Sequence, residues 1–472
     1  MFKKIVSLTF LLFVALSTWA EGRAKYVFYF IGDGMGVNQV LGTETYLAAL
    51  EGRIGVNHLC FTSFPHVALA STYSATNGVT DSAASGTALS TGRKTKNGAV
   101  GMLQDQKTAV NGVAVWAHEA GAAVGISTSV SIDHATPACF YAHQPERHMY
   151  YEIGCDLTQS DFDFFAGSDF ISPQNKKDDK AKNLYDLCKE TGYTIVRGYD
   201  ECVQKGMKAD KLILFQSEKA SQRDRKSLPY AIDSQKDDLT LTQITQAGIE
   251  YLSQKQKDGF FFMIEGGKID FACHSNDAGT AFREVIDMDN AVKEAYKFYQ
   301  QHPDETLIVI TADHETGGLV LGRGPYELHT DLLRYQQMSA ELYSRHIQKL
   351  HKEMGKKFTW EVAQKDIATY WGLGKDIELT KQQVEQLHQA YKDMMKKAAK
   401  DVKSLYARIN LLANAARDVM AQCTLIGWQS GGHSNGHVPV WAVGVGAEEF
   451  HGRMENSDIP LVIAKVAGWT ER

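Results

Sequence analysis

Residues 26–34 read YVFYFIGDG, in which six apolar, β-prone residues run without interruption into Gly-Asp-Gly. Similar stretches follow at 123–128 (AVGIST), 260–264 (FFFMI), 306–310 (TLIVI) and 438–445 (VPVWAVGV). Continuous runs of this kind are typical of strands buried on both faces, as in a parallel sheet covered by helices. A helical pattern over residues 280–299 lies between two of them. The sequence therefore predicts an α/β fold, with helices flanking both faces of a large, mostly parallel central sheet.

The length and composition of the chain agree with this fold class. Its 472 residues allow one large α/β domain with an insertion, or two to three domains of about 150 residues each. Apolar residues make up 44% and charged residues 22%, which is enough for a substantial core. The net charge of -6 leaves no global basic surface, so we do not expect nucleic acid as a binding partner.

Residues 1–20 have the order of a secretory signal peptide. Lys3 and Lys4 precede an apolar run at 5–16, and Ser-Thr-Trp-Ala follows up to Ala20. The run is too short to span a bilayer, and no Cys follows it where a lipid anchor would attach. We therefore expect an exported protein, periplasmic or extracellular, with no membrane span after cleavage and with residues 21–472 as a single domain. A retained N-terminal anchor is the alternative.

The seven cysteines are scattered and form no C-x-x-C pair. An exported compartment permits disulfides, and Cys139–Cys155 and Cys188–Cys202 are the plausible local pairs. Buried free thiols are an equally good interpretation. The odd number leaves at least one thiol free in either case.

Residues from about 331 to 422 have a different composition, with no Pro and only three Gly. The stretch Thr380-Lys-Gln-Gln383 has the pattern of a capping box. Apolar residues then recur at spacings of three and four from Val384 to Leu405, which predicts one face of a helix. We expect a mostly helical insertion without a catalytic motif. Residues 155–235 are charged and mixed, and predict surface elements.

Polar residues that can bind metal ions follow several of the predicted strands. Asp270 and His274 are four apart, so a helix would place both on one face, where they can hold one ion such as zinc. Taken alone, Asp270 and His274 also fit an ordinary pair on a helix surface, and the polar residues that follow the other predicted strands also fit ordinary turns. Together they supply seven ligands, namely Asp33, Glu265, Asp270, Asp313, His274, His314 and His433. That set is too large for one zinc, and suits two zinc ions plus an oxygen-preferring ion such as magnesium, to which Thr136 can add an oxygen.

Residues 79–92, VTDSAASGTALSTG, contain six hydroxyl side chains and one acid, Asp81. The composition suits a helix of small residues in which Ser and Thr bond only to the local backbone. It also suits a nucleophile at a helix start, where free N–H groups favour a phosphate. In the second case Asp81 is expected to cap the helix, and Ala83, Ala84 and Gly86 leave room for substrate and metals.

In their order along the chain, these motifs resemble those of the alkaline phosphatases. The resemblance rests on GDGMG at 32–36, DSAAS at 81–85, HATPA at 134–138, Arg147, EGG at 265–267, Asp270, His274, TADH at 311–314 and GHS at 432–434. The set spans nearly all of the chain after the signal peptide, which implies one alkaline phosphatase-like catalytic domain over residues 21–472.

The resemblance implies three ion sites. It implies a first zinc held by Asp270, His274 and His433. It implies a second zinc held by Asp33, Asp313, His314 and Ser82. It implies a magnesium held by Asp33, Thr136 and Glu265.

The resemblance also implies the reaction. Ser82 would attack the phosphorus of a small phosphate monoester, and water would hydrolyse the phosphoserine to release phosphate and an alcohol. Arg147 matches the arginine that holds the phosphate, and its guanidinium can bind two non-bridging oxygens at once. Members of the family are commonly dimers, so a homodimer is possible here.

Two positions depart from the family pattern. Some bacterial members carry Asp at the position of His134 and Lys at that of Phe271, whereas animal members usually have His at both. We expect His134 to lie in the outer shell of the third ion, whose identity it leaves open. We expect Phe271 either to narrow the pocket and stack on an organic leaving group, or to have only a packing role in the protein interior.

The motifs leave other functions to compare with this one. A sulfatase needs C/S-x-P-x-R, and the residues after Ser82 exclude it. A phosphodiesterase or phosphoglycerate mutase of the same superfamily is harder to exclude from the metal ligands. An exported zinc- or phosphate-binding protein without turnover is the alternative from another class.

Overall fold

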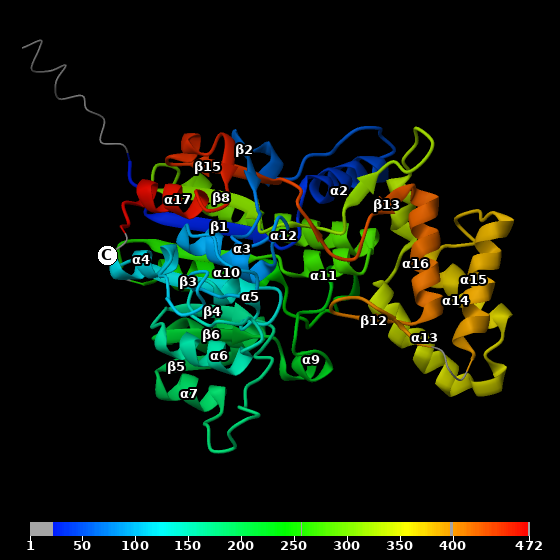
Figure 1. Ribbon diagram of the computed structural model, residues 1–472, viewed down its shortest axis with the longest axis horizontal. Helices are drawn as coiled ribbons and strands as arrows, with labels where there is room; N and C mark the ends of the chain where they lie inside the picture. Colours follow the sequence, from blue (N-terminus) through cyan, green and yellow to red (C-terminus); the bar gives the residue numbers. More distant parts are fainter. Residues whose placement is uncertain (1–21, 256, 397–399, 471–472) are drawn as a thin grey trace, which may run out of the picture.

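The computed structural model describes residues 22–255, 257–396 and 400–470 (Figure 1). The predicted signal peptide, residues 1–20, lies outside the described residues. A ten-stranded sheet forms the centre of the molecule. Its strands, in order across the sheet, are β16 (Gly452–Glu455), β2 (His66–Ser71), β15 (Val438–Gly444), β8 (Thr306–Ala312), β1 (Tyr26–Gly32), β7 (Phe260–Glu265), β3 (Ala123–Thr128), β4 (Phe164–Gly167), β6 (Lys211–Phe215) and β5 (Tyr193–Arg197).

The sheet is mostly parallel, as the sequence predicts. β15 is antiparallel to both of its neighbours, β8 and β2, and the other neighbouring strands pair in parallel. In the middle of the sheet, Ile31 of β1 pairs with Glu265 of β7 and with Thr311 of β8. Nearly every residue of these three strands is buried, which is why their sequences are continuous apolar runs.

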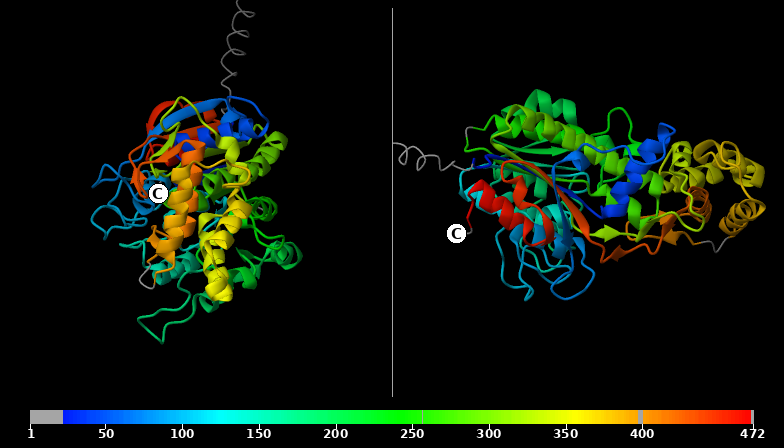
Figure 2. Two further views of the ribbon diagram at one scale, coloured as in Figure 1. Left: turned by 90° about the vertical axis from the view of Figure 1, so that its right-hand side faces the viewer. Right: turned by 90° about the horizontal axis from the view of Figure 1, so that it is seen from above.

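Helices cover both faces of the sheet (Figure 2). On one face lie α10 (Leu241–Ser253) and α12 (Ala278–Gln301), and on the other lie α3 (Ser82–Thr91), α4 (Val113–Glu119) and α17 (Ile459–Ala467). The predicted fold class is therefore confirmed.

The remaining elements connect these layers. The helices among them are α2 (Val37–Leu50), α5 (Ala135–Ala138), α6 (Tyr150–Gln159), α7 (Leu184–Glu190), α8 (Tyr199–Lys205), α9 (Glu218–Arg223) and α11 (Lys268–His274). The short strands are β9 (Glu315–Thr316), β10 (Leu319–Leu321), β13 (Ile426–Trp428) and β14 (His433–Ser434). The 3-10 helices of this part are η1 (Phe61–Ser63), η2 (Gly206–Lys208), η3 (Ala231–Asp233) and η6 (Ala447–Glu449).

The prediction for residues 155–235 was wrong in one respect. This stretch contributes β4, β5 and β6, so one end of the central sheet comes from it. These strands are only four or five residues long and alternate with charged loops, so no long apolar run marks them.

Between residues 330 and 424 the chain is mainly helical and extends away from one end of the sheet (yellow to orange in Figure 1). Its elements are η4 (Thr330–Tyr335), α13 (Ala340–Met354), η5 (Gly355–Lys357), α14 (Trp360–Trp371), α15 (Lys381–Met394) and α16 (Leu411–Thr424). They pack around a second hydrophobic cluster, which includes Tyr343, Trp371 and Leu412 and which Tyr46 of α2 and Phe282 of α12 also join.

The expected capping box is present, because Thr380 and Gln383 bond each other's backbone at the start of α15. The expected helix does not continue to Leu405, however. α15 ends at Met394, and Val402 lies in a two-stranded hairpin formed by β11 (Val402–Lys403) and β12 (Arg408–Ile409). Apolar spacing of three and four therefore persisted by coincidence beyond the helix end.

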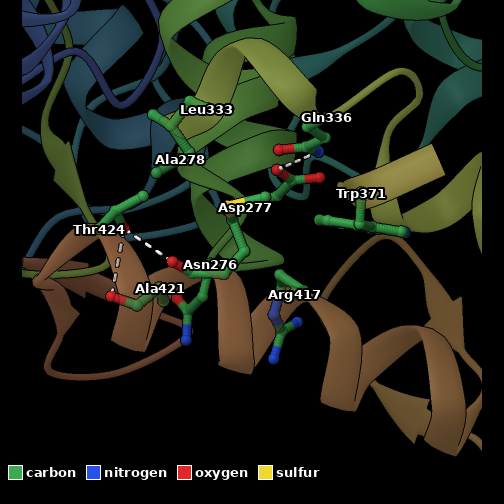
Figure 3. A pocket seen from close by; sticks show the side chains of 11 residues that line it. Asn276, Asp277, Ala278, Leu333, Gln336, Trp371, Arg417, Ala421 and Thr424 are labelled. Atoms are coloured by element: carbon green, nitrogen blue, oxygen red, sulfur yellow. Dashed lines mark hydrogen bonds between the residues drawn. The ribbon is translucent and has the colours of Figure 1, made fainter. Parts of the chain in front are cut away.

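The carboxylate of Asp277 joins this helix-rich segment to α12, one of the helices that cover the sheet. Asp277 caps α12 by accepting from the backbone N–H of Thr280 (3.1 Å), and it also accepts from Gln336 Nε2 (2.9 Å) and Ala340 N (2.8 Å). Figure 3 shows the bond between Gln336 and Asp277. Gly279 makes room for this contact, because a Cβ at that position would lie 2.0 Å from Gln336 Oε1 and would displace the side chain of Gln336.

All seven cysteines are free thiols in the structure. The local pairs Cys139–Cys155 and Cys188–Cys202 are therefore not formed. Cys139, Cys188 and Cys202 are instead buried in the main hydrophobic core, as in the second interpretation. Among the described residues, no helix combines the length and the apolar character needed to cross a membrane.

Candidate active site

Four neighbouring parallel strands, β8, β1, β7 and β3, bring their carboxyl ends to one edge of the sheet. Asp33 follows β1, Glu265 is the last residue of β7, and Asp313 and His314 follow β8. All four side chains are buried in the structure. Ligand sites of open α/β sheets lie beyond the carboxyl ends of the strands, and here that position is occupied by ionisable groups.

The close approach of Asp33 to the other ligands depends on Gly34. This residue has φ +73°, and a Cβ there would lie 2.9 Å from Thr316 Oγ1 and 3.0 Å from Asp270 Oδ1. Its N–H donates to Asp313 Oδ1 (3.0 Å). The Gly-Asp-Gly turn after β1 therefore packs directly against the segments that follow β7 and β8.

The first group of possible ligands consists of Asp270, His274 and His433. Asp270 and His274 lie one turn apart on α11, with Asp270 Oδ2 3.2 Å from His274 Nε2, as their spacing predicts. His433 reaches them because β14 pairs with β9, so that His433 lies opposite Thr316. The Nε2 atoms of His274 and His433 are 3.2 Å apart.

The orientation of these imidazoles suits metal binding. His274 Nδ1 bonds the carbonyl of Gly431 (2.6 Å) and His433 Nδ1 bonds the carbonyl of Thr80 (2.8 Å). Because a carbonyl can only accept, each Nδ1 donates, and each Nε2 is the ring nitrogen that faces the other candidate ligands. Burial alone would lower the pKa of His274, but the adjacent Asp270 raises it above its ordinary value. Burial, followed by the neighbouring His314, lowers the pKa of His433 to about 4, so this ring is neutral near pH 7.

The second group surrounds His314 Nε2. Asp313 Oδ2 lies 3.1 Å from this atom, Ser82 Oγ 3.3 Å and Asp33 Oδ1 3.5 Å. The opposite ring nitrogen, Nδ1, contacts Thr316 Oγ1 (3.2 Å), whose hydroxyl donates to Asp270 Oδ1 (2.6 Å). Since that hydroxyl donates its proton to Asp270, it accepts from Nδ1, and Nε2 is the ring nitrogen that faces the candidate ligands. Burial alone would lower the pKa of His314, but the adjacent Asp313 raises it above its ordinary value.

The third group contains Asp33, Glu265 and His134, whose ligand atoms all lie within 4.8 Å of one another. The hydroxyl of Thr128 donates to Glu265. Burial raises the pKa of Glu265 to about 8, although the hydroxyls of Thr128 and Thr136 lower it. The structure thus places Thr136 beside Glu265, as expected, and also brings His134 to the same place.

Ser82 begins α3, and the whole helix is buried. Gly86 lies one turn further along and faces α5 rather than the ligands. A Cβ there would meet Cys139 Sγ at 3.0 Å and Thr136 Cα at 3.3 Å. The expectation that Gly86 leaves room for substrate and metals was therefore wrong, because it allows α3 and α5 to pack closely. In this way it positions Thr136.

Asp81 is the N-cap of α3, as expected, and accepts from Ala84 N (3.0 Å). It has a second role that sequence reasoning missed. Its Oδ2 forms an ion pair with Arg147 Nη1 (3.0 Å), and the N–H of Gly98 donates to both carboxylate oxygens (3.1 Å each). Arg147 Nη2 lies 3.4 Å from His134 Nε2. Asp81, which precedes Ser82 in the sequence, therefore fixes the position of Arg147.

The carboxylates lie close together and are deeply buried, an arrangement that a bound cation would stabilise. Burial, and then the nearby Asp313, raises the pKa of Asp33 well above its ordinary value. Neither oxygen of Asp33 has a hydrogen-bond partner among the described residues. Burial alone would also raise the pKa of Asp270, but the adjacent His274 lowers it. Buried unpaired carboxylates are costly, and a bound cation removes that cost.

Phe271 lies next to Asp270 and is almost fully buried. Its ring stacks on that of Tyr406, with the centroids 3.8 Å apart and the planes at 17°. Tyr406 comes from the turn of the β11–β12 hairpin, and no motif marks it in the sequence. The structure therefore adds one aromatic side chain to the candidate site.

The fold and the site together define an α/β enzyme with a metal-binding centre at the carboxyl ends of its parallel strands. The family model of the alkaline phosphatases matches residues 24–469. Alkaline phosphatase 3 of Bacillus subtilis is 30% identical over 98% of this chain and 96% of that protein. Alkaline phosphatase 4 of the same organism is 30% identical over 82% of this chain and 76% of that protein. The chain belongs to the alkaline phosphatase family, which hydrolyses phosphate monoesters.

Solved structures agree with this family. The cold-active alkaline phosphatase of Shewanella sp. superimposes with a TM-score of 0.76 at 27% identity, over 94% of this chain and 99% of that one. The alkaline phosphatase of the Antarctic bacterium TAB5 gives 0.65 at 26% identity, over 95% and 99% of the two chains. A variant of the TAB5 enzyme was solved with magnesium bound in its M3 site.

Proposed function

We propose that this alkaline phosphatase hydrolyses small phosphate monoesters through a phosphoserine on Ser82, at a site that holds two Zn²⁺ and one Mg²⁺. The observation that carries the proposal is the position of Ser82. Its buried hydroxyl lies at the N-terminus of α3 and 3.3 Å from His314 Nε2, among the carboxylates and imidazoles of the candidate site.

The residues present fit three cations. The first two groups combine carboxylate oxygens with imidazole Nε2 atoms, a donor set that suits zinc. We assign Asp270, His274 and His433 to one zinc, and Asp33, Asp313, His314 and Ser82 to the other. The third group offers mostly oxygen, from Asp33, Thr136 and Glu265, which suits magnesium. His134 lies within reach of this third position, and we propose that it acts on that ion through an intervening water.

The chain's own residues perform the transfer as follows. Ser82 attacks the phosphorus in line with the departing alcohol, and water later cleaves the phosphoserine. Arg147 binds two non-bridging oxygens of the phosphoryl group, held in place by Asp81. The N–H groups at the start of α3 add positive potential at the same point. When bound, the metal ions neutralise the charge of the phosphate and lower the pKa of the oxygens that they contact.

Substitution of the nucleophile tests this proposal. We expect Ser82→Ala, loaded with zinc and magnesium, to lose nearly all turnover of an aryl phosphate and to form no phosphorylated protein in an acid-quenched reaction. Ser90→Ala is the matched control, because Ser90 is buried on the same helix and donates only to the carbonyl of Thr87. Full activity of Ser82→Ala would show that another group carries the phosphoryl transfer.

We also propose that residues 21–472 form one catalytic domain, that the chain is exported after removal of residues 1–20, and that it works as a homodimer. The supporting observations are the order of charged, apolar and small residues at the N-terminus and the match to the family over residues 24–469. N-terminal sequencing of secreted protein and light scattering test the export and the dimer, respectively.

A further inference from the structure

The β11–β12 hairpin reaches from the helix-rich segment to the candidate active site. Its turn is closed by Ser404, whose N–H donates to the carbonyl of Ala407 (2.9 Å) and whose Oγ accepts from Ala407 N (3.0 Å). The same Oγ lies 3.4 Å from Ser275 Oγ, immediately after α11. These contacts fix Tyr406, in the turn, against the helix that carries Asp270 and His274.

The ring of Tyr406 touches three aromatic side chains of the site. It stacks on Phe271, and its centroid lies 5.3 Å from that of His274 and 6.0 Å from that of His134, both approached edge to face. Phe271 itself is 5.8 Å from His134. Phe271 and Tyr406, which we call the aromatic wall, therefore line one side of the ligand cluster.

The exposure of the side chains indicates on which side of the ligand cluster the organic group of a bound substrate would meet solvent. The ligands His274 and Asp270 are closed off, with side chains 2% and 0% exposed. Arg147 and His433 are 13% and 11% exposed, and Tyr406 is also partly exposed, whereas Phe271 is buried. A phosphoryl group held by Arg147 would direct its organic group towards solvent on this open side. Tyr406 is a partly exposed aromatic side chain there that also contacts the candidate ligands His274 and His134.

On the proposed function, we infer that Tyr406 contacts the organic group of the substrate and favours monoesters with a flat, aromatic leaving group over small aliphatic ones. Phe271 supports Tyr406 from behind rather than meeting the substrate. This division of roles follows from burial: the outer ring is accessible, and the inner ring is covered by it. The hairpin thereby gives the helix-rich segment a part in substrate selection.

Binding of two phosphonates to the zinc- and magnesium-loaded protein tests the inference by calorimetry. Phenylphosphonate and methylphosphonate share the phosphoryl-like head and differ in the ring. We expect Tyr406→Ala to weaken phenylphosphonate by about three- to tenfold, the range of an aromatic pair, and to leave methylphosphonate unchanged. Tyr406→Phe should bind both as the unaltered protein does, because it keeps the ring.

Leu405→Ala is the matched control, since Leu405 adjoins Tyr406 in the turn and is 61% exposed. Equal weakening of both phosphonates in Tyr406→Ala, or no change in either, would overturn the inference, as would a Tyr406→Phe variant that behaves like Tyr406→Ala. The measurement does not depend on turnover. A protein that binds both phosphonates but hydrolyses no monoester would refute the proposed function and leave the assignment of Tyr406 standing.

Discussion

Replacing Asp81 by Asn separates its two roles in the candidate site, which are capping α3 and forming the ion pair with Arg147. Asn caps helices about as well as Asp, so the bond from Ala84 N and the start of α3 should survive. The charge that holds Arg147 is lost. Burial alone would raise the pKa of Asp81, but Arg147 and the N–H groups of Ala84 and Gly98 hold it below its ordinary value, so the carboxylate is ionised in the native protein.

The size of the effect follows from what Arg147 is proposed to do. Charge-assisted hydrogen bonds of a guanidinium to phosphate contribute about 1.5–3 kcal/mol, so Arg147→Ala should weaken inhibition by inorganic phosphate roughly 10- to 150-fold. Asp81→Asn keeps the guanidinium of Arg147 but removes the ion pair that fixes its position. This substitution should cost about half of the free energy lost in Arg147→Ala, so inhibition by inorganic phosphate should weaken roughly three- to tenfold. The ion pair is only partly exposed, with side chains at 13% and 21%, so screening by solvent is limited.

The assay is the inhibition constant of inorganic phosphate, measured for both single variants and for the double variant. If Asp81 acts through Arg147, Asp81→Asn should change nothing further once Arg147 is Ala. An equal loss in both backgrounds would refute the reasoning, and would place the effect of Asp81 in the helix cap or in the field of the site. Thermal unfolding of each variant serves as the control for folding.

Three further predictions rest on other parts of the structure. Chelation of the metals should abolish activity and lower the free energy of unfolding by about 3 kcal/mol or more, reversibly on adding zinc and magnesium; an unchanged melting temperature would contradict the proposed sites. Gly86→Ala should destabilise the protein by about 1–2 kcal/mol, because its Cβ would lie 3.0 Å from Cys139 Sγ, and the cost measured by denaturant unfolding should shrink in a Cys139→Ala background. Burial raises the pKa of Asp233 to about 6. Protonation of Asp233 therefore stabilises the folded protein fully below about pH 4, and this stabilisation is lost as the pH rises through 6. Because Asn does not ionise, the free energy of unfolding of Asp233→Asn relative to that of the unaltered protein should rise between pH 4 and 7, by up to about 3 kcal/mol. Thermal unfolding measures this, and a difference that does not change with pH would contradict the prediction.

The parts of the fold that could be predicted are those in which one physical signal dominates. β1, β3, β7 and β8 are buried on both faces, so each is a continuous apolar run that ends in a polar turn. β4, β5 and β6 gave no such signal, because they are short and lie between charged loops. The turn from Val402 to Ile409 was hidden for a different reason: its apolar residues happened to continue the helical spacing of α15.

The candidate ligands could be predicted because their chemistry is restrictive. Few residue types bind zinc or magnesium, and those in this chain follow strands whose ends must meet. Asp81 and Tyr406 could not be assigned from the sequence, since an N-cap acid and a hairpin tyrosine are common in any protein. Their roles depend on contacts with Arg147 and Phe271 that only the folded chain reveals. The same holds for Gly86, whose neighbour α5 is about fifty residues away along the chain.

The place of β15 between β8 and β2 links completion of the sheet to completion of the first group of possible ligands. Residues 438–444 are translated late, yet they occupy an interior position of the sheet, and β2 and β16 attach to the rest of it only through them. His433 immediately precedes this strand and arrives with it. Until that segment has been synthesised, the chain has neither a complete sheet nor a complete first group of possible ligands. Adding the interior strand β15 and completing the first group of possible ligands are thus coupled, because one late segment of the chain supplies both.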